Sequence, residues 1–178
     1  MHRQYESALT YYDAAQMLEP TSGFAAFRAG NLALECGQYE TAIQKLLNAL
    51  SAVPDHTPTT YLLARAYAGN RMPVDALKYA ERTLQNDPNH AGALLLKLRS
   101  LADMQKWEEI RNLEGQLPTR LFEANEVYLW SALAHAHSRD TNQALQHYSK
   151  ITEKTRRRFP DTVQVIASMI SIGIPKNS

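Results

Sequence analysis

The 178-residue sequence contains one cysteine, Cys36, so no disulfide can form within the chain. This usage favours a reducing compartment, and we expect a cytoplasmic protein. Residues 1–20 are polar and amphipathic and lack the apolar segment of a signal peptide. No apolar run reaches the ~18 residues that a membrane span requires. The sequence therefore predicts neither a secretory leader nor a transmembrane segment.

The sequence also lacks an excess of either charge sign: it has 19 Lys and Arg and 18 Asp and Glu, which gives a net charge of +1. A nearly neutral chain has no bulk attraction to nucleic acid or to a membrane surface, so we expect neither as a partner. The seven glycines form no phosphate-binding loop, dinucleotide fingerprint or nucleophile elbow. We accordingly predict no cofactor, no catalytic residue and no enzymatic activity.

Three histidines, His135, His137 and His147, invite comparison with a metal site. Two side chains that are two residues apart on a helix point ~200° away from each other, so His135 and His137 cannot bind the same ion. No cysteine or carboxylate accompanies them at a ligand spacing. The sequence alone predicts no metal site.

Two consecutive 34-residue units, Gly23–His56 and Thr57–His90, organise the chain. Small residues at positions 8 and 20 of a unit allow two helices to approach closely, and Pro at position 32 ends the second helix because it lacks an N–H. Neither unit can bury its apolar face alone, so the units must stack. The matched positions hold Gly30, Gly37, Tyr39, Ala42, Ile43, Ala49, Leu50 and Pro54 in the first unit, and Ala64, Arg71, Pro73, Ala76, Leu77, Thr83, Leu84 and Pro88 in the second.

This pattern resembles the tetratricopeptide repeat (TPR), most closely in its second half, from Gly37 and Tyr39 to Pro54. The resemblance implies an all-α fold, an α-solenoid of stacked antiparallel helix pairs in a right-handed superhelix. Sliding the 34-residue register extends one array over the whole chain. Its predicted parts are a half repeat at 1–22 that supplies a second helix only, repeats at 23–56 and 57–90, a divergent repeat at 91–124, a repeat at 125–160, and a capping helix with a tail at 161–178.

The later repeats depart from the pattern through their prolines. Pro118 comes early, so the second helix of the divergent repeat should be short. Pro160 comes late, so we expect a long helix that begins near Asp140 and ends at about Arg158. Before it we expect another long helix, over 121–138, and after it a last helix over about 162–172.

In TPR proteins the first helices line the concave face, and the resemblance implies a peptide-binding groove there in this chain. Aromatic side chains would supply buried area, and guanidinium groups could hold carboxylates bidentately. The alternative is that Phe24 and Phe27 pack on the N-terminal helix and that Arg99 pairs with Asp103 on a solvated surface. The candidate groove residues are Phe24, Phe27, Asn31, Tyr61, Arg65, Leu95 and Arg99.

The resemblance favours a non-enzymatic scaffold or adaptor that binds a peptide or a partner domain of unknown identity. A second hypothesis is a recruiting domain of a larger enzyme or secretion-type assembly, because the first half repeat lacks its first helix. A third is self-association, including a homodimer, through apolar helices at the ends of the array. The candidate contacts for that third hypothesis are Tyr5, Leu9, Tyr12, Ile166, Met169 and Ile170.

Overall fold

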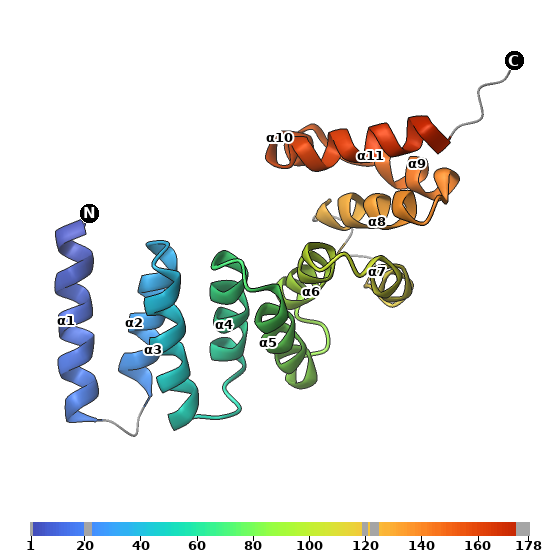
Figure 1. Cartoon of the computed structure of the whole chain (residues 1–178). Coiled ribbons are helices and arrows are strands. Elements are labelled where there is room, and N and C mark those ends of the chain that lie inside the picture. Colours follow the sequence, from blue (N-terminus) through green and yellow to red (C-terminus); the bar gives the residue numbers. More distant parts are fainter. Residues whose placement is uncertain (1, 20–22, 119–120, 122–124, 174–178) are drawn as a thin grey trace, which may run out of the picture. The chain divides into compact units, whose positions relative to one another are not determined.

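The structure is a computed structural model that describes residues 2–19, 23–118, 121 and 125–173. The described residues form eleven α-helices and no strand, which confirms the prediction of an all-α fold (Figure 1). The chain divides into two compact units, Met1–Ser100 (unit 1) and Leu101–Ser178 (unit 2), and each is described by itself. None of the helices within the described ranges is long and apolar enough to cross a membrane.

Unit 1 consists of antiparallel helix pairs that follow the 34-residue register. Helices α2 and α3 pack as one pair and α4 and α5 as the next, with α1 against α2 and α3 against α4 (Figure 1). Each of these two pairs lies within one of the predicted repeats, 23–56 and 57–90. The helices are α1 (His2–Leu18), α2 (Phe24–Glu35), α3 (Tyr39–Ala52), α4 (Thr57–Gly69), α5 (Pro73–Asn86) and α6 (Ala91–Asp103), the last of which reaches into unit 2.

Small side chains allow the close approach within each pair. A Cβ atom added to Gly30 would lie 2.6 Å from Cγ of Leu46, so α2 and α3 can meet here only without a side chain at position 30. Ala42, Ala64 and Ala76 occupy the other small positions and are fully buried. The backbones therefore meet at the predicted positions, and the aliphatic core packs around them.

One turn geometry recurs every 34 residues. Gly37, Arg71, Gln105 and Arg139 all have positive φ, between 58° and 73°. The residue after each of them donates its backbone N–H to the carbonyl five residues earlier, at 2.9–3.0 Å. This is the Schellman arrangement, which ends a helix through a left-handed residue. The period thus persists at Gln105 and Arg139, where the sequence supplies no glycine.

Unit 2 contains the short helix α7, the pair α8 and α9, the six-residue α10 and the last helix, α11. Helix α11 packs on both α8 and α9. The shortness of α7, eight residues, agrees with the prediction from Pro118. The helices are α7 (Trp107–Glu114), α8 (Glu126–His137), α9 (Thr141–Ser149), α10 (Glu153–Arg158) and α11 (Pro160–Gly173).

Two helix predictions in unit 2 are wrong, and Asn125 lies at both differences; residues 122–124 of the first predicted helix lie outside the described part of the chain. Helix α8 begins at Glu126, because Asn125 adopts a left-handed conformation with φ of 60°. The helix expected to reach Arg158 breaks after Ser149. At that break the Asn125 amide donates to the carbonyl of Lys150 at 3.0 Å, and its Oδ1 accepts the backbone N–H of Thr152 at 2.7 Å. A side chain 25 residues earlier in the sequence therefore satisfies the interrupted backbone.

Candidate functional site

Helix α2 carries the first aromatic residues of the predicted groove. Phe24 is 67% exposed, so α1 does not cover it. Phe24 and Phe27 line a pocket of about 110 Å³ with Val53, His56 and Thr59. This small depression lies where one helix pair meets the start of the next, and an apolar side chain of a partner could enter it.

The aromatic residue at position 5 of each regular repeat contacts a histidine at position 34. The Phe27 ring lies edge-on to His56, with centroids 5.2 Å apart. The Tyr61 ring lies 4.4 Å from that of His90. Tyr61 also abuts the backbone at Gly92, where an added Cβ would overlap the phenol ring. The two aromatic rings are thus held in fixed positions by residues that the sequence analysis did not consider.

Polar side chains occupy position 9 of three successive first helices: Asn31, Arg65 and Arg99. The Asn31 amide donates to Oε1 of Glu35 at 3.1 Å. Both arginines are exposed, and the Arg65 guanidinium lies 5.9 Å from the Tyr61 ring centroid. We refer to the predicted set as the first-helix surface; its members are Phe24, Phe27, Asn31, Tyr61, Arg65, the half-buried Leu95, and Arg99.

Some of the residues that the sequence analysis proposes for self-association lie at the surface, and others lie in the interior. On α1, Leu9 and Tyr12 are half-buried, and the side chain of Tyr5 lies outside the described part of the chain. On α11, Ile166 and Ile170 are buried within the chain itself, at 0% and 5% exposure. Of the three α11 residues, only Met169 reaches the surface. Ile166 and Ile170 therefore offer little surface to a second chain, on a helix that packs against α8 and α9.

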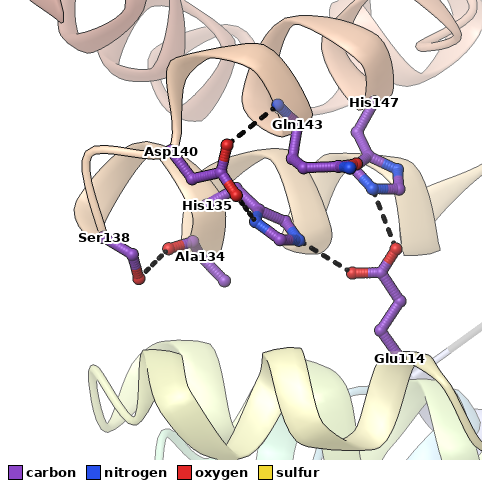
Figure 2. Close-up of polar contacts among 7 residues, drawn as sticks. All are labelled: Glu114, Ala134, His135, Ser138, Asp140, Gln143 and His147. Atoms are coloured by element: carbon purple, nitrogen blue, oxygen red, sulfur yellow. Dashed lines mark hydrogen bonds and ion pairs between the residues drawn. The ribbon is translucent and has the colours of Figure 1, made fainter.

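Unit 2 contains a group of ionisable side chains that the sequence analysis missed (Figure 2). Glu114, the last residue of α7, faces His135 of α8 and His147 of α9. Its Oε1 lies 2.8 Å from Nε2 of His147, and its Oε2 lies 3.3 Å from Nε2 of His135. The three side chains are only 9–17% exposed. We call these three residues the polar cluster.

Asp140 adds a second carboxylate beside the polar cluster. Its Oδ2 lies 3.4 Å from Nδ1 of His135, within ion-pair distance but not aligned as a hydrogen bond. Its Oδ1 accepts the backbone N–H of Gln143 at 3.2 Å and so caps α9 near the predicted start of a helix (Figure 2). The hydrogen bond to Gln143 at the start of α9 therefore holds the Asp140 side chain in place, independently of its contact with His135.

The histidines decide the charge of the Glu114 carboxyl. Burial by itself raises the pKa of this group, but the hydrogen bonds and positive charge of His147 and His135 outweigh burial, so that its pKa is lowered.

His137 lies outside the polar cluster and stacks on Trp107, with ring centroids 4.1 Å apart. Burial lowers the pKa of His137.

The polar cluster could have been suspected from the repeat register. His135 and His147 lie on the two helices of one pair, on either side of a turn centred near residue 139, so an antiparallel arrangement brings them close. Glu114 gave no signal, because it belongs to the preceding and irregular repeat. Sequence spacing alone does not bring a residue of α7 to the α8–α9 pair.

No protein-family model matches the sequence, and a search of curated proteins finds no relative. Three of the solved structures with a similar fold illustrate the likeness. YrrB, described as a TPR protein with an unusual peptide-binding site, superposes with a TM-score of 0.74 at 21% identity and covers 96% of this chain and 84% of its own. TTC0263, a thermophilic TPR protein of Thermus thermophilus, gives a TM-score of 0.57 at 18% identity over 94% of this chain and 91% of its own.

The third is PilF of Pseudomonas aeruginosa, with a TM-score of 0.63 at 18% identity over 88% of this chain and 71% of its own. Repeating antiparallel helix pairs, the 34-residue turn period and these likenesses agree with one another. The chain has the fold of a TPR protein, as its sequence suggested.

Proposed function

We propose that this protein is a non-enzymatic scaffold that holds an acidic peptide or an acidic segment of a partner protein on its first-helix surface. The observation that carries the proposal is the recurrence of exposed cationic side chains, Arg65 and Arg99, at one position of consecutive first helices. A guanidinium can bind a carboxylate with two parallel hydrogen bonds, which gives direction as well as attraction.

The aromatic side chains give the proposed surface an apolar end. Phe24 is exposed beside a pocket that Phe27 and Val53 also line. Exposed aromatic residues next to a pocket are typical of the anchors that dominate protein–protein contacts. The proposed ligand therefore carries an apolar side chain for this pocket and carboxylates for the arginines. One of the solved structures of similar fold, YrrB, is described as having a peptide-binding site.

The test uses a peptide selected from a displayed random library on the full chain. Fluorescence anisotropy then compares its affinity for the wild type and for Arg65→Ala/Arg99→Ala. Each charge-assisted contact contributes roughly 1.5–3 kcal/mol, so losing both should weaken binding by at least about a hundredfold. Phe24→Ala should weaken it as well.

The matched control is Lys78→Ala/Arg111→Ala, which removes the same charge from positions on α5 and α7 that lie outside the first-helix surface. Its affinity should equal that of the wild type. Equal losses in the two double variants would indicate attraction by net charge alone, and unchanged affinity in Arg65→Ala/Arg99→Ala would reject the proposed surface.

A second candidate function is self-association through α1. Tyr11, Met17 and Leu18 on this helix are 77–84% exposed. Light scattering over a tenfold range of concentration tests it: growth of the mass that Tyr11→Ser/Leu18→Ser abolishes supports this face, and a constant monomer mass removes it.

A further inference from the structure

His135 lies between two carboxylates. Its Nε2 is 3.3 Å from Oε2 of Glu114, and its Nδ1 is 3.4 Å from Oδ2 of Asp140. Nδ1 of His135 is buried and has no hydrogen-bond partner, so its contact with Asp140 is not a hydrogen bond. His135 thus brings one ring nitrogen to each of two carboxylates, and a histidine with a carboxylate on its far nitrogen is a common arrangement beside metal ions.

His147 brings a second imidazole to the same carboxylate. Its Nε2 is 2.8 Å from Oε1 of Glu114, and its ring stacks on that of His135 with centroids 5.5 Å apart. Both Nδ1 atoms are buried without a hydrogen-bond partner, and both Nε2 atoms turn toward Glu114 (Figure 2). The polar cluster thus directs one oxygen-bearing group and two nitrogens toward one small region.

The separations suit a transition-metal ion. The three ligand atoms lie within 4.8 Å of one another. Tetrahedral bonds of ~2.0–2.1 Å place neighbouring ligand atoms about 3.3 Å apart. On binding, the 2.8 Å distance between Oε1 of Glu114 and Nε2 of His147 would lengthen, and any distance between ligand atoms that approaches 4.8 Å would shorten. Rotations about side-chain torsions can supply both shifts. Because the side chains remain 9–17% exposed, an ion can reach them from solvent.

We propose that Glu114, His135 and His147 bind one divalent transition-metal ion, and that Zn²⁺ fits best. Two imidazoles and one carboxylate suit Zn²⁺, whereas Mg²⁺ and Ca²⁺ prefer oxygen ligands alone. Three protein ligands leave the fourth position to water. Asp140, whose Oδ2 lies 3.4 Å from Nδ1 of His135, would serve as the outer carboxylate that orients this ligand when the ion is bound.

The proposal departs from the expectation, based on sequence, that the chain has no metal site. The geometric argument against His137 still applies, since that ring stacks on Trp107 away from the polar cluster. Glu114 supplies the ligand that the sequence spacing did not reveal. Each ligand comes from a different helix, so the ion would tie α7 to the α8–α9 pair within unit 2. The site is separate from the first-helix surface, and either proposal can fail without the other.

The test uses the full chain without a histidine tag, stripped with EDTA and titrated with ZnCl₂ by calorimetry. We expect one Zn²⁺ per chain and a melting temperature that rises with the Zn²⁺ concentration. Co²⁺ should bind at the same stoichiometry and give the visible absorption of a low-coordinate nitrogen and oxygen site.

Variants locate the ion. Glu114→Gln, His135→Gln and His147→Gln should each abolish stoichiometric binding. His137→Gln is the matched control, because it removes a neighbouring imidazole outside the polar cluster, and it should bind as the wild type does. Asp140→Asn keeps the oxygen that caps α9 but loses the charge, so Zn²⁺ affinity should fall by about 10–100-fold.

Three results would overturn the site. The wild type could bind neither ion stoichiometrically, the three ligand variants could bind like the wild type, or His137→Gln alone could lose binding. If a ligand variant loses helicity by circular dichroism, the wild-type Co²⁺ complex decides. Two strongly shifted, exchangeable imidazole N–H signals are expected in its proton NMR spectrum, and a spectrum without them contradicts the proposal.

Discussion

The helix pairs of unit 1 and the α8–α9 pair of unit 2 have the same turn, but the polar groups they bury differ. In unit 1 the buried polar side chains include Thr60 and Thr83, whose hydroxyls bond to each other at 2.9 Å. In unit 2 the buried set includes the ionisable His147, with Glu114 and His135 nearly covered beside it. The backbone repeat is therefore compatible with either interior. Turns and close helix approach set the period, and the chemistry of the interior is free to vary.

The largest effect should come from the aliphatic core of unit 1. Leu46→Ala removes a fully buried side chain, and we expect a loss of roughly 2–5 kcal/mol in the free energy of unfolding. Leu47→Ala, at a neighbouring position that is 38% exposed, is the matched control and should cost far less. Urea denaturation followed by circular dichroism measures both. Similar losses would mean that the core does not sit where the repeat register places it.

A smaller effect should come from the close approach of α2 and α3. Gly30→Ala places a Cβ 2.6 Å from Cγ of Leu46, so we expect a loss of about 1–3 kcal/mol despite the better helix propensity of alanine. Gly115→Ala in unit 2 meets nothing within 4 Å and should be neutral or slightly stabilising. A stable Gly30→Ala variant would show that the pair can separate without cost.

The shared turn can be tested by exchanging its residue types between the two units. Gly37 has φ of 73° and open space around it, so Gly37→Ala should cost about 1–2 kcal/mol through backbone strain alone. Gln105→Gly should raise the free energy of unfolding by less than about 1 kcal/mol. Glycine relieves the backbone strain at this positive φ, but it also increases the conformational entropy of the unfolded chain, which offsets part of the gain. The shifts of the two urea midpoints should have opposite signs. The same sign in both would indicate that the turns are not equivalent.

The smallest effect should come from Asn125, which is specific to unit 2. Asn125→Ala removes its hydrogen bonds to Lys150 and Thr152, which lie near solvent, and we expect a loss of about 0.5–1.5 kcal/mol. Amide exchange should rise at Thr152 and stay unchanged within α8. Asn125→Asp keeps the acceptor for Thr152 and should therefore protect that amide. Equal exchange in all three proteins would remove Asn125 as the cause of the helix break.

Local chemistry made most of unit 1 predictable from sequence. Gly30 meets Leu46, 16 residues later, and Pro73 lies in the first turn of α5, so each signal acts within its own 34-residue unit. The failures in unit 2 arise from contacts that are distant in sequence. Asn125 hydrogen-bonds to a helix break 25 residues away, and Glu114 reaches histidines 21 and 33 residues later.

The candidate sites show the same division. The register predicted the positions of Arg65 and Arg99 on consecutive first helices, because residues 34 apart occupy the same place in successive repeats. It could not predict that His56 and His90 fix the aromatic rings, since ring contacts depend on side-chain torsions. Nor could it assemble the polar cluster, which depends on how the irregular α7 packs against α8.

The most direct test of the proposed scaffold is the chemical-shift map of the selected acidic peptide on the ¹⁵N-labelled wild-type chain. The proposal predicts that the perturbed amides concentrate on α2, α4 and the part of α6 in unit 1, with the Arg65 and Arg99 side-chain signals among the largest shifts. Perturbations confined to unit 2, or spread evenly over both units, would contradict it.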